Sequence, residues 1–114
     1  MSKSIFEKII DREIPAQIIH ETDELLAFRD VNPQAPAHFL IIPKKRFHRL
    51  AEVPADEAGL LGRLLLAAAA VARQEGLAAD GYRIVINNGA NGGETVPHLH
   101  IHVLGGRALQ WPPG

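Results

Sequence analysis

Three histidines alternate with apolar residues in the segment 98–104, at positions His98, His100 and His102. The chain contains six histidines, so half of them lie in this short stretch. Alternate side chains of a β-strand point to the same face, so the spacing predicts three imidazoles on one face and three apolar side chains in the core. An imidazole with its ordinary pKa of about 6.5 is mostly neutral at pH 7, where it can act as a nucleophile, a hydrogen-bond donor or a metal ligand.

Two interpretations of these histidines need no covalent chemistry. A solvated polar strand face is one, although serine, threonine or lysine would serve solubility equally well. A zinc site is the other. His98 and His102 would lie about 13 Å apart along a strand, whereas zinc–nitrogen bonds measure about 2.0–2.1 Å. One ion would therefore take two of the three histidines and a further ligand, for which His38 is the best candidate.

Covalent catalysis by the middle histidine is the interpretation that we favour. His100 would attack a phosphorus atom while its neighbours donate hydrogen bonds to the phosphate oxygens as charge develops. The chain has no cysteine, which leaves histidine as the remaining strong nucleophile for this centre. The preceding loop, residues 87–95, offers glycine amides, asparagine side chains and the Thr95 hydroxyl, a combination that suits an anion. Glycine and asparagine also suit an ordinary turn, so the loop adds support only through its position before the histidines.

Shorter patterns predict the elements that position these residues. A capping box of Ser4 and Glu7 predicts a short helix that runs to about Arg12 and is ended by Pro15. Apolar runs bounded by turn residues predict five strands. These strands are Ile18–His20, Leu25–Phe28, His38–Ile42, Tyr82–Ile86 and His98–Leu104.

A longer helix is expected to begin near Pro54 and Asp56, to run to about Glu75 and to stop at Gly76. We expect its apolar face to pack on the sheet, with partner binding as the alternative. That face consists of Leu60, Leu61, Leu64, Leu65, Ala68 and Ala72. Strands in hairpin succession with segregated helices indicate one α+β domain over residues 1–114, with an antiparallel five-stranded sheet, one long helix and one short helix.

Composition and charge argue against several classes of protein. The 12 basic and 13 acidic residues nearly cancel, and no basic run exceeds Lys44-Lys45-Arg46, so a nucleic-acid partner is not expected. The whole segment Lys44–Arg49 is predicted to be a surface turn. The longest apolar run, Leu64–Ala72, is far shorter than the roughly 20 residues that cross a bilayer, so no membrane partner is expected. The lack of cysteine and of an apolar leader suits a cytoplasmic protein.

The segment 98–104 resembles the signature of the histidine triad (HIT) superfamily, in which three histidines alternate with apolar residues. More specifically, the chain is similar to the Hint branch of that superfamily over nearly its whole length. The residues that carry this likeness are Ile5–Ile10 with Ile14-Pro15-Ala16, the block from Asp30 through His38 to Lys45, and Gly105-Gly106-Arg107 with Trp111–Gly114. The resemblance implies a HIT-like fold.

The resemblance also implies a role for each matching position. His100 would form a nucleotidyl-imidazole at its Nε2 atom, with its other ring nitrogen held by the main-chain carbonyl of His98. His102 and His38 would surround the phosphate, and Asp30 would accept hydrogen bonds from the ribose hydroxyls. Further nucleotide contacts would come from Asn87, Gly93 and Thr95 in the loop and from Phe6, Ile9, Ile10, Phe28 and Val31 around the purine.

The implied reaction is hydrolysis of the P–N bond in a purine nucleoside 5′-phosphoramidate, which releases AMP or GMP and an amine without a metal or another cofactor. Thr95 stands where the family commonly carries serine, so a hydroxyl is retained near the leaving group. The family also implies a homodimer built through Tyr82–Ile86 and the long helix, with Trp111 near the partner's site. The alternatives are dinucleoside polyphosphate hydrolysis or nucleotidyl transfer, a nucleotide-binding regulatory module with weak activity, and a zinc-binding regulator.

Overall fold

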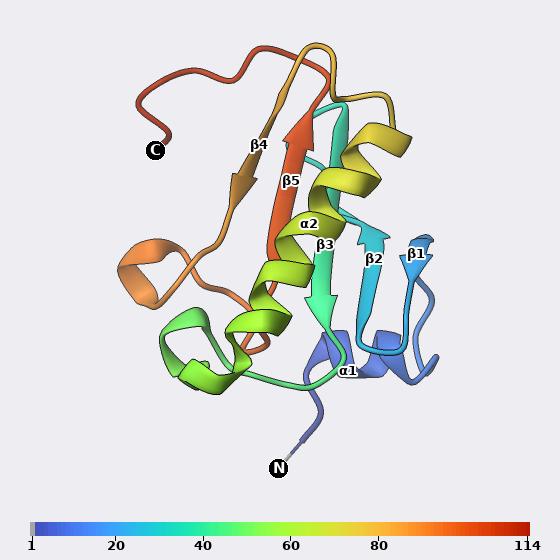
Figure 1. Cartoon of the computed structure of the whole chain (residues 1–114), viewed down its shortest axis with the longest axis vertical. Coiled ribbons are helices and arrows are strands. Elements are labelled where there is room, and N and C mark those ends of the chain that lie inside the picture. Colours follow the sequence, from blue (N-terminus) through green and yellow to red (C-terminus); the bar gives the residue numbers. More distant parts are fainter. Residues whose placement is uncertain (1) are drawn as a thin grey trace.

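A computed structural model describes residues 2–114 and contains a five-stranded antiparallel sheet in the order β1-β2-β3-β5-β4 (Figure 1). The strands are β1 (Ile18–Glu21), β2 (Leu25–Arg29), β3 (Ala37–Pro43), β4 (Tyr82–Val85) and β5 (Ile101–Gly105). The helices are α1 (Ile5–Ile10) and α2 (Ala58–Gln74), with the short 3₁₀ turns η1 (Leu50–Glu52), η2 (Ala55–Glu57) and η3 (Ala90–Gly92). The predicted fold class, an antiparallel five-stranded α+β fold with one long and one short helix, is therefore confirmed.

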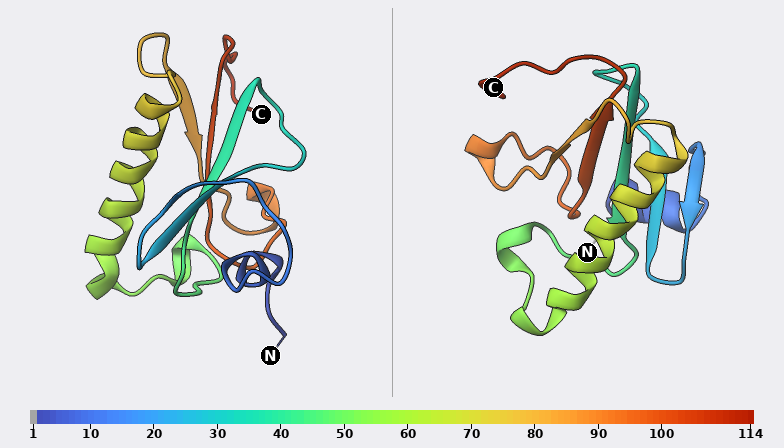
Figure 2. Two further views of the ribbon diagram at one scale, coloured as in Figure 1. Left: turned by 90° about the vertical axis from the view of Figure 1, so that its right-hand side faces the viewer. Right: turned by 45° about the horizontal axis from the view of Figure 1, so that its top comes forward.

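The two helices pack against opposite faces of the sheet (Figure 2). Side chains alternate along each strand, so the central strands supply apolar residues to both faces. On the α2 face, the buried cluster includes Leu25, Ala27, Phe39, Ile41, Ile101 and Val103. On the α1 face, the smaller cluster consists of Phe6, Ile9, Leu26, Phe28, Leu40 and Ile42. The sheet is thus covered by apolar packing on both sides, and only part of the α1 face remains for polar residues.

Helix α1 begins as the sequence predicts but ends sooner. The Ser4 side chain accepts a hydrogen bond from the Glu7 main chain, and the Glu7 side chain accepts one from the Ser4 main chain, so the capping box is confirmed. The helix ends at Ile10 because Arg12 adopts a left-handed conformation with φ of 62°. The expectation that Pro15 ends the helix is therefore wrong, since the chain has already turned before it.

Helix α2 begins at Ala58, later than expected, because η2 occupies the turn that follows Pro54. Its buried face contains Leu60, Leu64, Ala68, Val71 and Ala72, as the apolar spacing largely predicts. Leu65 is different from the expectation: 42% of it is exposed, so it lies outside the packed face. Within residues 2–114, no helix is both long and apolar enough to cross a membrane.

Strand β5 begins at Ile101, so the predicted strand His98–Leu104 is wrong at its start. The pairing of β5 with β3 ends at Ile101 opposite Ile41. Before that point the main chain bonds to loops instead: the His98 amide donates to Val96, and the Leu99 amide donates to Phe47. The first two histidines of the triad therefore lie in a segment that precedes β5 and is not part of the sheet.

Candidate active site

A cavity of about 270 Å³ opens on the α1 face of the sheet, between helix α1 and the start of β5. One side is apolar and is formed by α1 and the segment after it. The other side carries polar groups that are far apart in the sequence. Of the residues that the sequence assigns to the site, the cavity is lined by His100, His102, Asp30, Thr95, Phe6, Ile9, Phe28 and Val31. A mixed apolar and polar cavity of this kind suits a small organic anion.

The His100 side chain is held in one tautomer. Its Nδ1 atom lies 2.7 Å from the main-chain oxygen of His98, and because a carbonyl only accepts, Nδ1 must carry the hydrogen. The Nε2 atom therefore keeps its lone pair. His100 is buried, and its ring packs edge-on against Phe6 and His102, with ring centres 5.0 Å away in each case. This is the contact between His98 and His100 that the family resemblance implies.

A chain of hydrogen bonds sets the tautomer of His102. The Gln34 main-chain N–H donates to His38 Nδ1 at 3.0 Å, so the His38 hydrogen sits on Nε2. His38 Nε2 then donates to His102 Nδ1 at 2.9 Å. His102 must consequently carry its own hydrogen on Nε2, and its ring packs against that of His100. His38 is a buried residue behind His102, and Asp30 Oδ2 lies 3.4 Å from its Nε2.

Burial keeps these two supporting imidazoles neutral. It lowers the pKa of His38, although the nearby Asp30 carboxylate acts in the opposite direction. Burial, together with the charges that His100 and His38 would carry, lowers the pKa of His102 to about 4, although Asp30 acts in the opposite direction. At neutral pH His102 is therefore a neutral hydrogen-bond donor rather than a cation.

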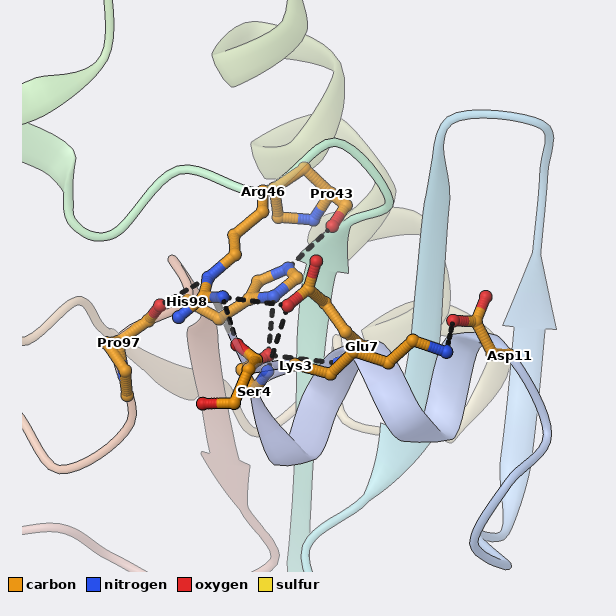
Figure 3. Close-up of polar contacts among 9 residues, drawn as sticks. Lys3, Ser4, Glu7, Asp11, Pro43, Arg46, Pro97 and His98 are labelled. Carbon is orange, nitrogen blue, oxygen red and sulfur yellow. Dashed lines mark hydrogen bonds and ion pairs between the residues drawn. The ribbon is translucent and has the colours of Figure 1, made fainter.

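The side chain of His98 does not stand beside the other two. It is fully buried, accepts a hydrogen bond from Ser4 Oγ at its Nδ1 (3.1 Å) and donates from Nε2 to the carbonyl of Pro43 (2.9 Å), as Figure 3 shows. The prediction of three imidazoles on one strand face is therefore wrong, because β5 begins only after His98 and His100. The interpretation as a solvated polar face also fails, since His98 and His100 are both buried.

Arg46 joins helix α1 to the segment that precedes His98, a link that the sequence analysis missed (Figure 3). Its Nη1 donates to Glu7 Oε1 at 2.9 Å, and its Nε donates to the carbonyl of Pro97 at 3.1 Å. The Arg46 side chain is only 17% exposed. The prediction of a plain surface turn at Lys44–Arg49 is therefore wrong at this residue. The sequence offered one hint of this link, because Glu7 of the capping box is an acidic side chain with which a basic residue can pair.

Three residues assigned to the nucleotide do not line the cavity. The Asn87 amide donates to the carbonyl of Gly92 at 2.6 Å, and Gly93 turns the loop with φ of 81°. Both hold the loop in shape, and within the loop 87–95 Thr95 is the residue that lines the cavity. Ile10 is half-buried and packs against the cluster of Phe6 and its neighbours.

Asp30, His38 and His102 place three ligand-type atoms within 4.8 Å of one another, a cluster that includes His38 but only one histidine of the triad, where the zinc interpretation required two. Their hydrogen bonds do not fit an ion. Two nitrogens on one tetrahedral zinc would lie about 3.4 Å apart, whereas His38 Nε2 and His102 Nδ1 lie 2.9 Å apart. A metal on His38 Nε2 would also move the ring hydrogen to Nδ1, against the Gln34 N–H donor. Zinc would therefore require His38 to rotate.

Comparison with known proteins shows to which family the chain belongs. The family model of the HIT domain matches residues 11–109. An uncharacterized HIT-like protein of Synechococcus elongatus is 61% identical over 111 residues, which cover 97% of this chain and 96% of that protein. A protein of Zea mays named as a 14 kDa zinc-binding protein is 52% identical over 115 residues, covering 99% of this chain and 89% of its own.

A solved structure agrees with the fold throughout. The crystal structure of a HIT family hydrolase from Legionella pneumophila superposes with a TM-score of 0.96 at 47% sequence identity, and the match covers 98% of this chain and 100% of that one. The family model spans most of the chain, including the whole triad segment, and the relatives match almost end to end. The chain therefore belongs to the HIT domain family.

Proposed function

We propose that this HIT family member is a hydrolase that cleaves the P–N bond of purine nucleoside 5′-phosphoramidates through a covalent intermediate on His100. The observation that carries the proposal is the pairing of two complementary nitrogens at one cavity wall. His100 offers the Nε2 lone pair because its Nδ1 donates to His98, and His102 carries a hydrogen on Nε2 because its Nδ1 accepts from His38. A nucleophile beside a neutral donor suits attack on a phosphorus atom that bears anionic oxygens.

In the first half-reaction, His100 Nε2 forms a bond to phosphorus as the P–N bond of the substrate breaks. The leaving nitrogen takes the electron pair of that bond and a proton from solvent, and departs as an amine. The imidazole acquires positive charge, which the His98 carbonyl stabilises through the hydrogen bond from Nδ1 at 2.7 Å. His102 Nε2–H donates to a phosphate oxygen as negative charge develops there.

In the second half-reaction, water attacks the same phosphorus and the bond to His100 breaks. The products are a nucleoside monophosphate and neutral His100, and the proton lost by water passes to solvent. Splitting one displacement into two lowers the barrier of each, which is the advantage of a covalent nucleophile. The neutral state of His102 matters in both steps. An imidazolium at this position would attract the anionic phosphate before the reaction begins, and so would stabilise the ground state as well as the transition state.

The rest of the cavity suits a purine nucleoside. Phe6, Ile9 and Phe28 supply an apolar wall on which a flat base can pack. Asp30 lines the same cavity, and although Oδ1 already accepts the Asn32 N–H at 2.8 Å, each carboxylate oxygen has a second lone pair for a ribose hydroxyl.

The test is turnover of an adenosine 5′-phosphoramidate in the presence of a chelator. We expect wild-type protein to release AMP, and His100→Ala to lose activity by about 10⁴-fold or more. His20→Ala is the matched control, since His20 lies on β1 away from the cavity. An alkaline quench followed by mass spectrometry should find a nucleotidyl adduct on the wild-type peptide containing His100. Activity that survives in His100→Ala would refute the proposal.

We also propose a homodimer. Strand β4 is at an edge of the sheet, and Ile84 on it is 37% exposed. Leu65 and Leu66 on α2 are exposed by 42% and 72%, so both elements keep apolar surface uncovered. Light scattering after gel filtration should give twice the monomer mass for wild type and the monomer mass for Leu66→Arg/Ile84→Arg.

A further inference from the structure

The basic segment Lys44–Arg49 is followed by η1, and together they form one side of a contact with the loop 87–95 (Figure 1). Arg49 and Glu94 make the main link. Arg49 Nε donates to Glu94 Oε1 at 2.8 Å, and Nη2 donates to Oε2 at 3.0 Å. This bidentate geometry fixes the orientation of both side chains, which a single contact would not do. A second link joins the same segments, because the Ala51 N–H donates to Asn88 Oδ1 at 2.8 Å.

Glu94 also closes its own loop. Its Oε1 accepts the Gly89 N–H at 2.8 Å, and its main-chain N–H donates to the Gly89 carbonyl at 3.1 Å. The hydrogen bonds from Arg49 and Gly89 lower the pKa of the Glu94 carboxyl to about 2, and the charge of protonated His100 acts in the same direction. The carboxylate is therefore ionised at every pH at which the protein would work.

The pair differs from an ordinary surface ion pair in its burial. The Glu94 side chain is 11% exposed and that of Arg49 is 34% exposed. Arg63 and Glu24 form a second bidentate pair with similar distances, 2.6 and 3.1 Å, but their side chains are 57% and 40% exposed. Solvent screens an exposed pair, so that pair contributes little. The Glu94 carboxylate is largely shielded and accepts three hydrogen bonds, two from Arg49 and one from Gly89, so it can hold the loop in place.

The residue that follows Glu94 is Thr95, which lines the cavity together with His100 and His102. We propose that Arg49 and Glu94 are positioning residues that hold the Thr95 hydroxyl at the leaving-group side of the cavity, an inference that rests on the proposed function. When the P–N bond breaks, its electron pair moves to nitrogen, and that nitrogen needs a proton from solvent water. The Thr95 hydroxyl orients the water and the departing amine. A leaving group that departs as a stable anion needs no such proton.

The experiment compares two substrates that share the nucleotide and differ in the leaving group. One is an adenosine 5′-phosphoramidate of an alkylamine, and the other is the p-nitrophenyl ester of AMP. For Glu94→Gln we expect kcat/KM to fall by about ten- to hundredfold with the amine substrate, because a small misplacement of a positioned group has an effect of this order. With the ester we expect a change of less than about twofold. Arg49→Lys should follow the same pattern, since lysine lacks the planar fork of arginine.

Two controls separate positioning from general loss of structure. Glu24→Gln makes the same chemical change in the exposed pair with Arg63 and should affect neither substrate. In Thr95→Ala protein, the further change Glu94→Gln should have little additional effect on the amine substrate, because the two residues would act as a unit. Thermal unfolding of each variant confirms that the protein measured is folded.

Each outcome of these measurements supports or overturns the positioning role of Arg49 and Glu94. Equal losses with both substrates would overturn the inference and assign Arg49 and Glu94 a purely structural role. No loss with the amine substrate, or full additivity with Thr95→Ala, would overturn it as well. Failure of the proposed function is distinguishable, since wild-type protein would then turn over neither substrate or His100→Ala would remain active.

Discussion

Replacing His98 by alanine should destabilise the protein strongly while leaving its chemistry largely intact. The imidazole is fully buried and links Ser4 Oγ to the Pro43 carbonyl. Removing it leaves both groups without their partner, at about 1–3 kcal/mol each, and also leaves a cavity where the ring was. We expect an unfolding free energy lower by about 4 kcal/mol, which in a domain of this size corresponds to a melting temperature lower by about 15 °C.

Urea unfolding at pH 7 measures this effect, and a double-mutant cycle with Ser4→Ala measures the coupling between the two side chains. We expect a coupling of about 1 kcal/mol. Well below the melting temperature, His98→Ala should keep turnover within about tenfold of wild type, because the carbonyl that orients His100 belongs to the main chain. Nearly unchanged stability, or a loss of turnover as large as that of His100→Ala in folded protein, would refute this assignment.

Three further predictions test other parts of the structure. The His102 imidazole should titrate near pH 4 in NMR spectra, and a midpoint near the ordinary histidine value would contradict the burial argument. The pKa of His102 is lower in the folded protein than in the unfolded chain, so the stability that the neutral ring confers at neutral pH is lost as the pH falls below about 6.5 toward 4. Urea titrations of His102→Asn should therefore show a shallower loss of stability over that pH range. Arg46→Gln should loosen helix α1 and raise KM about fivefold, and a loss confined to kcat would contradict that role. Leu64→Ala on the fully buried face of α2 should lower the unfolding free energy by about 2–5 kcal/mol in urea titrations without a change in KM.

Local patterns predicted the elements well because their causes are local. The capping box of Ser4 and Glu7 involves groups three residues apart, and the apolar spacing of α2 follows from the period of the helix itself. The end of α1 was misplaced, because Arg12 turns the chain before Pro15 does. The start of β5 was misplaced for a different reason. A strand ends where its neighbours stop pairing with it, and Ile41 on β3 is 60 residues away in the sequence.

The functional site likewise has features that the sequence predicted and features that only the tertiary structure decided. The alternation of 98–104 identified the two imidazoles that line the cavity, and their residue types determined the available chemistry. The family resemblance already implied the contact between the His100 ring and the carbonyl of His98. Only the tertiary structure decided which nitrogen of His102 carries the hydrogen, since that depends on His38 and on the amide of Gln34. It also decided that the side chain of His98 supports the fold.

The sequence by itself therefore determined the family and the strand and helix content, and it indicated His100 as the candidate nucleophile, because these follow from residue types at short spacings. The tertiary structure decided the partners of the charged and polar side chains. Arg46 and Arg49 belong to one short basic segment, yet one holds helix α1 and the other holds the loop before Thr95. A side-chain hydrogen bond depends on ångström-scale distances between distant segments, and the order of residues alone does not specify those distances.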